Sequence, residues 1–348
     1  MRTTVASDWG IEMRTFRRVE TGHGRDGRAV IRSDGPPSHT VHAPGGIAVS
    51  ELLWLDGPVR SIDDGRDRDG GGFPLEPPVG GASFRIISMP PPEPGADPDT
   101  TWLRVPSDDP GRPGMHTTDT LDYVVVIDGE IVLGLDDGDH RLGPGDVVIQ
   151  RGTPHRWRVV GDRPCTYGVL MLRPDPGATP GATALHPRDS DTTAASGTAR
   201  MRRLVTATDA DGKSFVHSFG LPPVVFEPSG PAGVSLIDFW QSGGPLRSAD
   251  QGGDADSWEL DPVGGGICCR SPQLPAGMDM GDRGWHATHT IDLNLVLRGR
   301  LELALPDGIT TELDVGETVV QRGTNHRWRP VGDEPTTWFA VMFAVGAS

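Results

Sequence analysis

The second half of this chain repeats the first. HTTDTLDYVVVIDGE at 116–130 corresponds to HATHTIDLNLVLRGR at 286–300, and QRGTPHRWR at 150–158 corresponds to QRGTNHRWR at 321–329. A repeat of this length indicates two copies of one folding unit, because a unit of about 150 residues buries enough surface to fold around its own core. The repeat therefore limits the possible folds to those in which one compact domain occurs twice.

The limits of the two copies follow from the ends of the repeat. RRVETGHGRDGRAV at 17–30 matches RRLVTATDADGKSF at 202–215, so the similarity begins close to the start of each copy. We predict an N-terminal domain at 14–175 and a C-terminal domain at 201–348. The segment 176–200 between them is small, polar and proline-containing, which is typical of a solvated linker.

Short apolar runs separated by turn residues make up the later part of each copy. In the first copy they are YVVVI, EIVLGL, VVIQ, RWRVV and YGVLML, with DG, DDGD, GPGD and GDRP between them. Runs of this length and spacing, without helical periodicity, indicate antiparallel strands in a sandwich or barrel. We predict an all-β protein.

Histidines and carboxylates recur at the same places in both copies. His116, Thr118 and Asp122 precede the turn glycine Gly129, and His155 follows the apolar run that ends at Gln150. The second copy has the equivalent set, which is His286, Thr288, Asp292, Gly299, Gln321 and His326.

With these residues the chain resembles the cupin superfamily, whose first motif places an H-x-H pair and a glutamate before a turn glycine and whose second motif carries a further histidine. It is similar in particular to single-cupin proteins with the patterns H-x-T-D-T-x-D-Y and Q-R-G-T-x-H-x-W. The resemblance implies two tandem double-stranded β-helix (jelly-roll) barrels, a bicupin arrangement.

Four motif positions differ from the usual cupin pattern in both copies, and one of them is the terminal asparagine of the second motif, which is Val159 or Pro330 here. Threonine replaces the second histidine, aspartate replaces the glutamate, and glutamine replaces the proline of the second motif. The resemblance implies that the metal ligands would be His116, Asp122 and His155 in one barrel and His286, Asp292 and His326 in the other.

Two histidines and a carboxylate form a set with open positions for water or substrate, and this set suits Fe, Zn, Mn or Ni. Gln150 and Gln321 are additional pocket candidates, since each could add an amide oxygen. The alternative is a metal-free polar network, in which each buried aspartate needs another partner.

Four further residues are candidates for the pockets. Asp119 and His289 occupy equivalent places, and they would serve as catalytic acid–base groups if they face the cavity; otherwise they lie on a rim loop. Trp157 and Trp328 lie two residues after a motif histidine, so in a strand they would point the same way as that histidine. They either wall a pocket for an aromatic ligand or pack in the core.

Charge and composition restrict the partners and the location. The net charge of −16 disfavours nucleic acid and anionic membranes, so we expect a small-molecule substrate, with a homodimer as a further possibility. Cys165, Cys268 and Cys269 have no disulfide or zinc spacing, and no signal peptide or membrane span is evident, which favours the cytoplasm.

The expected function is that of a metal-assisted enzyme acting on a small aromatic or polyketide-type carbonyl compound, with cyclase, isomerase or lyase chemistry. One alternative is a non-heme Fe(II) dioxygenase of the bicupin type. Another is a metal-free small-molecule-binding protein. Both copies keep the candidate ligands, so the sequence does not choose between the barrels.

Overall fold

The computed structural model describes residues 4–6, 12–14, 16–43, 45–68, 72–179, 181, 183–190, 201–227 and 233–346. Strands dominate these residues, and the helical turns among them are four short 3-10 helices, which confirms the predicted all-β class. Parts of the predicted linker, 180, 182 and 191–200, lie outside the described residues. No helix in the part of the chain that the structure describes has the length and apolarity needed to cross a membrane.

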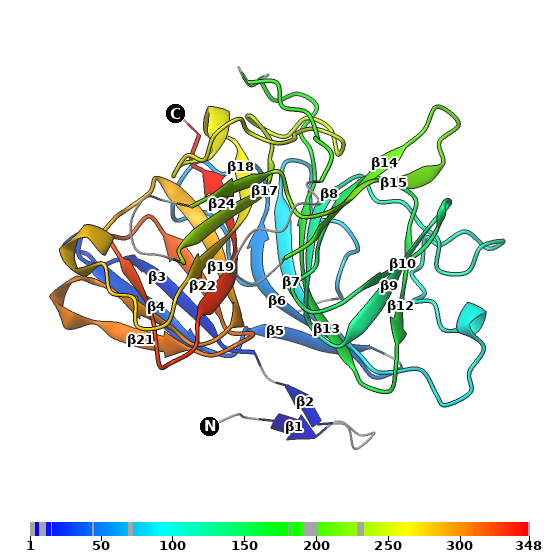
Figure 1. Ribbon diagram of the computed structural model, residues 1–348, viewed down its shortest axis with the longest axis horizontal. Helices are drawn as coiled ribbons and strands as arrows, with labels where there is room; N and C mark the ends of the chain where they lie inside the picture. Colours follow the sequence, from blue (N-terminus) through cyan, green and yellow to red (C-terminus); the bar gives the residue numbers. More distant parts are fainter. Residues whose placement is uncertain are drawn as a thin grey trace.

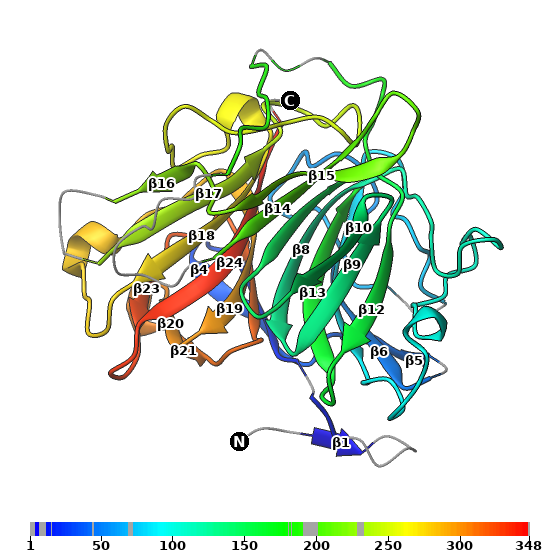
Figure 2. The same cartoon turned by 45° about the vertical axis from the view of Figure 1, so that its right-hand side comes forward.

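Two eight-stranded sheets form the centre of the molecule (Figures 1 and 2). The first has the order β15-β14-β11-β8-β13-β7-β6-β5, with β15 (Ser214–Gly220), β14 (Arg203–Thr208), β11 (Val147–Arg151), β8 (Leu121–Asp128), β13 (Cys165–Leu172), β7 (Ala82–Met89), β6 (Ile47–Leu55) and β5 (His39–Ala43). The second has the order β16-β17-β18-β24-β19-β22-β3-β4, with β16 (Val224–Phe226), β17 (Ser235–Gln241), β18 (Ile267–Leu274), β24 (Thr336–Ala344), β19 (Thr290–Arg298), β22 (Thr318–Arg322), β3 (Arg18–His23) and β4 (Ala29–Gly35).

A three-stranded sheet faces each large sheet and closes a barrel. In barrel one these strands are β10 (Gly138–Leu142), β9 (Glu130–Leu135) and β12 (Arg156–Val160), and in barrel two they are β21 (Thr310–Leu313), β20 (Leu301–Ala304) and β23 (Arg327–Pro330). The remaining elements are β1 (Thr4–Ala6), β2 (Glu12–Arg14), η1 (Pro98–Thr100), η2 (Val263–Gly265), η3 (Gly281–Gly284) and η4 (Pro306–Gly308).

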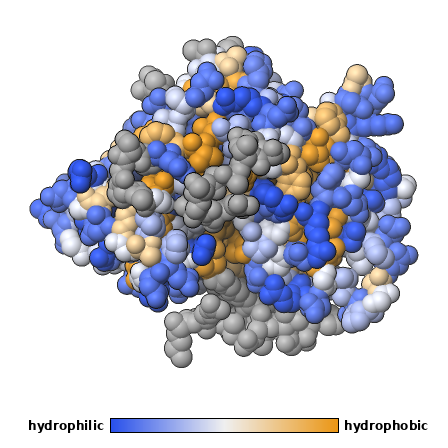
Figure 3. Space-filling model, viewed as in Figure 1, coloured by the Kyte–Doolittle hydropathy of each residue, from blue (hydrophilic) through white to orange (hydrophobic). Residues whose placement is uncertain are grey.

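Alternating side chains of the central strands serve two different cores. On β8, Leu121, Tyr123 and Val125 belong to the cluster between the two large sheets, whereas Val124 and Val126 belong to the interior of barrel one. Successive residues of a strand point to opposite faces, so Asp122 shares the face of Val124 and points into the barrel. The face drawn in Figure 3 is largely hydrophilic at its margins, as expected when the apolar residues fill these cores.

The first strands of each copy join the sheet of the other copy. β14 runs parallel to β11, with Val147 opposite Arg203 and Ile149 opposite Val205. β3 likewise runs parallel to β22 and pairs Thr318 with Arg18. Figure 1 shows this exchange, since the blue strands β3 and β4 lie among the orange and red strands of barrel two. Each barrel therefore contains strands from both copies of the repeat.

Candidate functional site

Two histidines lie side by side in each barrel. His116 precedes β8 and His155 precedes β12, and their backbones form a bridge with N–O distances of 3.0 and 2.9 Å. Their ring centroids lie 4.4 Å apart. His286 and His326 repeat the arrangement in barrel two, with ring centroids 4.3 Å apart. The structure thus brings together the histidines that are far apart in the sequence.

Backbone carbonyls fix the orientation of all four rings. Nδ1 lies 2.9 Å from the carbonyl oxygen of Gly114 for His116, of Thr153 for His155, of Gly284 for His286 and of Thr324 for His326. A carbonyl oxygen only accepts, so these contacts favour a proton on each Nδ1 and a lone pair on each Nε2, although at His326 the amide nitrogen of Gln321 also lies 3.1 Å from Nδ1. Among the residues that the structure describes, no side chain or backbone group bonds these Nε2 atoms.

Burial keeps the second histidine of each pair neutral. Desolvation, followed by the charge of the neighbouring histidine, lowers the pKa of His155 and of His326 to about 3. Burial also lowers the pKa of His116. A neutral imidazole with a free Nε2 and an Nδ1–H held by a carbonyl is the form that binds a metal ion.

The two motif aspartates are buried inside the barrels. Asp122 is 4% exposed and Asp292 is 5% exposed, and the Oδ1 atom of each has no hydrogen-bond partner among the described residues. Desolvation raises the pKa of each carboxyl from 3.8 to about 7, although hydroxyl groups of neighbouring threonines oppose the shift. Each carboxyl is therefore able to hold or release a proton near neutral pH.

A glutamine lies directly across the sheet from each aspartate. Asp122 pairs with Gln150 and Asp292 pairs with Gln321 in the antiparallel register. Both glutamines are buried, and their Oε1 atoms also lack partners among the described residues. Each barrel interior therefore holds two buried oxygens that a ligand, a water molecule or an ion could satisfy.

The donors fit a divalent transition metal in part. The paired imidazoles offer two free nitrogens in each barrel, which suits Fe, Zn, Mn or Ni. The described residues contain no group of three or more His, Cys, Asp or Glu side chains close enough to hold an ion. The structure thus pairs the histidines, and the carboxylate that was expected as third ligand stays a prediction in both barrels.

The two tryptophans lie beside the histidines. Trp157 is buried, 6.1 Å from the ring of His155 in an edge-on arrangement, and it stacks on Tyr167 at 6.2 Å. Trp328 is half-buried, 5.4 Å from the ring of His326. Both positions combine core packing with a wall next to the histidine pair.

Asp119 and His289 lie at the surface, on the segments that lead into β8 and β19. Asp119 lines a pocket of about 760 Å³ at the junction of the two halves. The pocket is lined by Glu76, Thr117, Thr118, Asp119, Arg151, Gly152, Ala207, Thr208, Ala249 and Asp250. The pocket is therefore built from both copies, and the motif histidines are not among its lining residues; His116 directly precedes Thr117 in the sequence.

An isoleucine stands at the equivalent place in barrel two. PVRSIDD at 58–64 corresponds to PLRSADQ at 245–251, so Ile62 is the counterpart of Ala249. A Cβ on Gly323 would lie 3.2 Å from Cγ2 of Ile62, whereas a Cβ on Gly152 would meet the smaller Cβ of Ala249 at 2.8 Å. Each side chain thus contacts the corresponding glycine, and the one in barrel two is the larger.

Each barrel also contains a buried arginine, Arg85 or Arg270, that was not predicted as a site residue from the sequence. In barrel one, Nε of Arg85 lies 3.4 Å from Oε1 of Glu51, and its terminal nitrogens bond the carbonyl oxygens of Pro74 and Leu75 at 2.8 and 3.2 Å. The positive charge of Arg85 also lowers the pKa of Asp122, against the stronger effect of burial.

Barrel two has the same arrangement. Nε of Arg270 lies 3.1 Å from Oδ1 of Asp238, and Nη1 bonds the carbonyl oxygen of Leu260 at 2.8 Å. Each arginine thus holds the loop before its strand over the barrel, close to the motif aspartate. The available signal was a charged residue at the same position of an apolar strand in both copies, SFRII and CCRSP.

Known proteins similar to this chain include members of a cupin-domain family. A family model described as a cupin domain matches residues 104–172, which include both histidines of barrel one. Phomopsin biosynthesis cluster protein C' of Diaporthe leptostromiformis is 33% identical over 154 residues, which are 42% of this chain and 72% of that protein. Cupin-domain-containing oxidoreductase srdB of Neurospora crassa is 29% identical over 166 residues, or 46% of this chain and 74% of that protein.

Solved structures resemble the chain more distantly. AerE from Microcystis aeruginosa gives a TM-score of 0.43 at 10% identity and covers 88% of this chain and 97% of its own. Oxalate decarboxylase from Lactobacillus farciminis gives a TM-score of 0.41 at 12% identity, over 89% of this chain and 85% of its own. No chemistry follows from a likeness of this kind.

Proposed function

Since this chain belongs to the cupin superfamily, we propose that it is a metal-assisted enzyme of small-molecule biosynthesis with its reaction site at the histidine-pair end of a barrel. The substrate would be a small aromatic or polyketide-type carbonyl compound, and the reaction a cyclisation, isomerisation or lyase step. The observation that carries the proposal is the pair of neutral imidazoles with free Nε2 atoms.

The residues of the chain would divide the work as follows. His116 and His155, or His286 and His326, would hold a divalent ion through Nε2. A bound ion of this kind polarises a carbonyl or enolate oxygen. Asp122 or Asp292, buried and with an unpartnered Oδ1, would take or return a proton on the substrate carbon. Trp157 would limit the space next to His155 to a flat ligand and exclude water from it.

Barrel one is the better candidate for the working site. The pocket at the junction includes Thr117 and Thr118, directly after His116, and Arg151 and Gly152 from the loop that leads to His155. Asp119 on its wall is then placed to contact the polar part of a ligand. Replacing Ala249 by isoleucine, the residue of the other half, would narrow the pocket and should raise KM, whereas Ile62→Ala should leave KM unchanged.

Metal analysis tests the ligand assignment. The purified full chain would be titrated calorimetrically with Zn²⁺, Mn²⁺, Ni²⁺ and, without oxygen, Fe²⁺. We expect His155→Ala to remove binding in barrel one and His326→Ala to remove it in barrel two. His140→Ala is the matched control, because His140 lies outside the motifs and pairs with Asp137 at 2.9 Å. Equal effects of all three variants would contradict the assignment.

A second candidate is an oxygen-dependent enzyme, a non-heme Fe(II) dioxygenase of the bicupin type. The name of the Neurospora crassa relative, an oxidoreductase, favours it. Turnover of phenolic and enolisable carbonyl compounds would be measured with and without O₂. Full activity without O₂ supports cyclase, isomerase or lyase chemistry, and activity that needs O₂ supports the dioxygenase.

The third hypothesis, a metal-free small-molecule-binding protein, predicts a different result in the same experiments. In that case the purified protein binds no stoichiometric metal and shows no turnover. This hypothesis also predicts that ligand affinity is unchanged in the double variant His155→Ala and His326→Ala.

A further inference from the structure

The loop that carries the second histidine of each barrel is held by a threonine of the other half. In barrel one this is Thr206, a fully buried residue of β14. Its Oγ1 accepts a hydrogen bond from the backbone nitrogen of Arg151 at 3.0 Å and another from Oγ1 of Thr153 at 3.0 Å. It donates to the carbonyl oxygen of Ile149 at 3.4 Å. One hydroxyl from the second copy thus bonds three residues of the first copy's motif.

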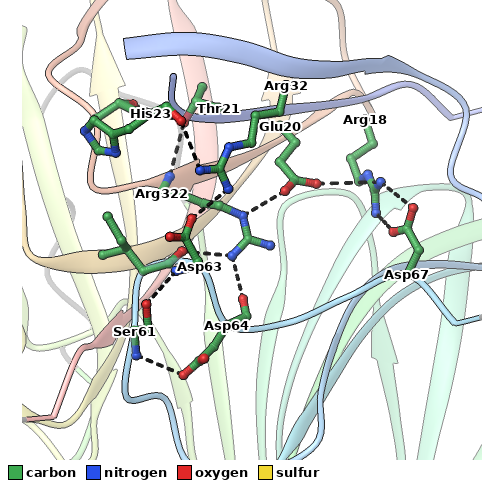
Figure 4. A network of polar contacts seen from close by, with 12 residues as sticks. Arg18, Glu20, Thr21, His23, Arg32, Ser61, Asp63, Asp64, Asp67 and Arg322 are labelled. Carbon is green, nitrogen blue, oxygen red and sulfur yellow. Dashed lines mark hydrogen bonds and ion pairs between the residues drawn. The ribbon is translucent and has the colours of Figure 1, made fainter. Parts of the chain in front are cut away.

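Thr21 does the same for barrel two. Its Oγ1 accepts from the backbone nitrogen of Arg322 at 3.1 Å and from Oγ1 of Thr324 at 3.0 Å. Figure 4 shows Thr21 and Arg322 within a network in which Arg322 also bonds Glu20 and the carbonyl oxygen of Asp64. Thr21 is fully buried, as Thr206 is.

The local backbone explains why a side chain makes these bonds. The parallel ladder between β11 and β14 ends where Ile149 pairs with Val205, and the pairing of β14 with β15 shifts register between Val205 and Thr206. A bulge re-aims the side chain next to it. The backbone nitrogen of Arg151, which lies beyond the end of the ladder, therefore donates its hydrogen bond to the hydroxyl of Thr206. β3 shifts register in the same way between Glu20 and Thr21.

Thr153 connects this hydroxyl to the histidine. Its carbonyl oxygen accepts from Nδ1 of His155 at 2.9 Å and from Nε2 of Gln150 at 3.0 Å. Its Oγ1 accepts from the same Gln150 amide while donating to Thr206. The position of Thr153 thus decides where the Nδ1 acceptor of His155 lies. In barrel two the corresponding links join Thr324 to His326 and to Gln321.

We propose that Thr206 and Thr21 are positioning residues that each half supplies to the other: Thr206 orients His155 and Gln150, and Thr21 orients His326 and Gln321. Each histidine pair is then complete only when both copies are folded against one another. The role of these histidines in binding rests on the proposed function, whereas the hydrogen-bonded chain from threonine to imidazole does not.

The ring tautomer of each histidine gives a readout that does not depend on activity. The full chain would be labelled with ¹⁵N-histidine, freed of metal by a chelator, and studied by NMR of the ring nitrogens at neutral pH. His155→Ala and His326→Ala assign the two signals. The native protein should show the Nδ1–H form for both rings. In Thr206→Val we expect the Nε2–H form of His155 to rise severalfold, because a bond of about 1 kcal/mol is weakened.

The variants form a crossed pattern with matched controls. Thr206→Val should change His155 and leave His326 as it is, and Thr21→Val should do the reverse. Thr206→Ser keeps the hydroxyl and should restore the native signal of His155. Thr318→Val removes another fully buried hydroxyl, one without a partner among the described residues, and should change neither ring.

Three outcomes would overturn the proposal. A folded Thr206→Val variant with an unchanged His155 tautomer would do so, and so would equal changes at His155 and His326. Thr153→Val removes the hydroxyl that links Thr206 to the His155 loop within barrel one itself. An unchanged His155 tautomer in that variant therefore refutes the proposal even if Thr206→Val does not fold.

Zn²⁺ titration of the same variants separates the two proposals. If the tautomers respond as expected and Zn²⁺ does not bind, the proposed function fails and the positioning role stands. If Zn²⁺ binds to both barrels and Thr206→Val leaves its affinity and the His155 tautomer unchanged, the positioning role fails and the proposed function stands.

Discussion

Replacing Asp122 by asparagine should stabilise the metal-free protein at neutral pH and have a much smaller effect in acid. The carboxyl is 4% exposed, and its burial raises the pKa from 3.8 to about 7. An unfolded chain releases this proton near pH 4, while the folded protein keeps it until about pH 7. Between these values the folded state binds more protons, so the free energy of unfolding falls as the pH rises. Asparagine is neutral throughout and avoids this loss.

The size of the effect follows from the two pKa values. The interval from 3.8 to about 7, at about 1.36 kcal/mol per pH unit, gives a ceiling of about 4 kcal/mol above pH 7. About 3 kcal/mol of this should develop between pH 4.5 and 7.5. The gain of the variant over the native chain should therefore grow by about that amount across this range.

The assay is denaturant unfolding of both proteins at several pH values, in the presence of a chelator. Asp162→Asn, at an exposed turn, is the control and should stay within about 0.5 kcal/mol of the native chain at every pH. Asp292→Asn should repeat the result in barrel two, where burial also raises the carboxyl pKa to about 7. A constant difference between Asp122→Asn and the native chain from pH 4.5 to 7.5 would refute the reasoning.

Three further results are expected. Arg85→Met should cost about 3 kcal/mol in unfolding free energy, because the buried carboxylate of Glu51 loses its nearest cation and keeps only Arg68 at 3.6 Å and the hydroxyl of Ser83. Arg141→Met, at an exposed pair, should cost far less, and equal costs would contradict this. Cys165, Cys268 and Cys269 should resist alkylation by iodoacetamide at pH 8 until the protein unfolds. The reason is that burial raises the thiol pKa of Cys165 and Cys268 to about 12 and that of Cys269 well above its usual value. Fast labelling of the native protein would count against this prediction. The segment 201–348 expressed alone should fail to give a folded monomer by circular dichroism and gel filtration, because β22 loses its partner β3, and coexpression with 1–200 should restore folding.

Much of the fold and part of the site could be predicted from local patterns. Short apolar runs between turn residues identify strands, because alternation and turn chemistry act over a few residues. The repeated motifs identify His116, His155 and their counterparts, and the structure does bring each pair together. Asp122 and Gln150 were also found, since both belong to the repeat, and the structure pairs them across the sheet.

Other features depend on contacts between residues that are far apart in the chain. Arg85 and Arg270 recur at the same position of a strand in both copies, but only the folded sheet places each beside a buried carboxylate. The distances that decide whether Asp122 belongs with the histidines are likewise a property of the closed barrel.

The sequence by itself determined that this protein has two copies of one β-rich unit, each with two motif histidines, because a repeat and a strand pattern are both properties of the linear chain. The resemblance of these motifs to the cupin pattern added the expectation of a barrel. Only the tertiary structure decided that the barrels exchange their first strands, so that Thr206 reaches the loop of His155 and Thr21 reaches that of His326. The physical reason is that a parallel strand satisfies its backbone hydrogen bonds equally well beside either copy of a repeated neighbour. Which copy it joins is settled by the packing of the whole molecule.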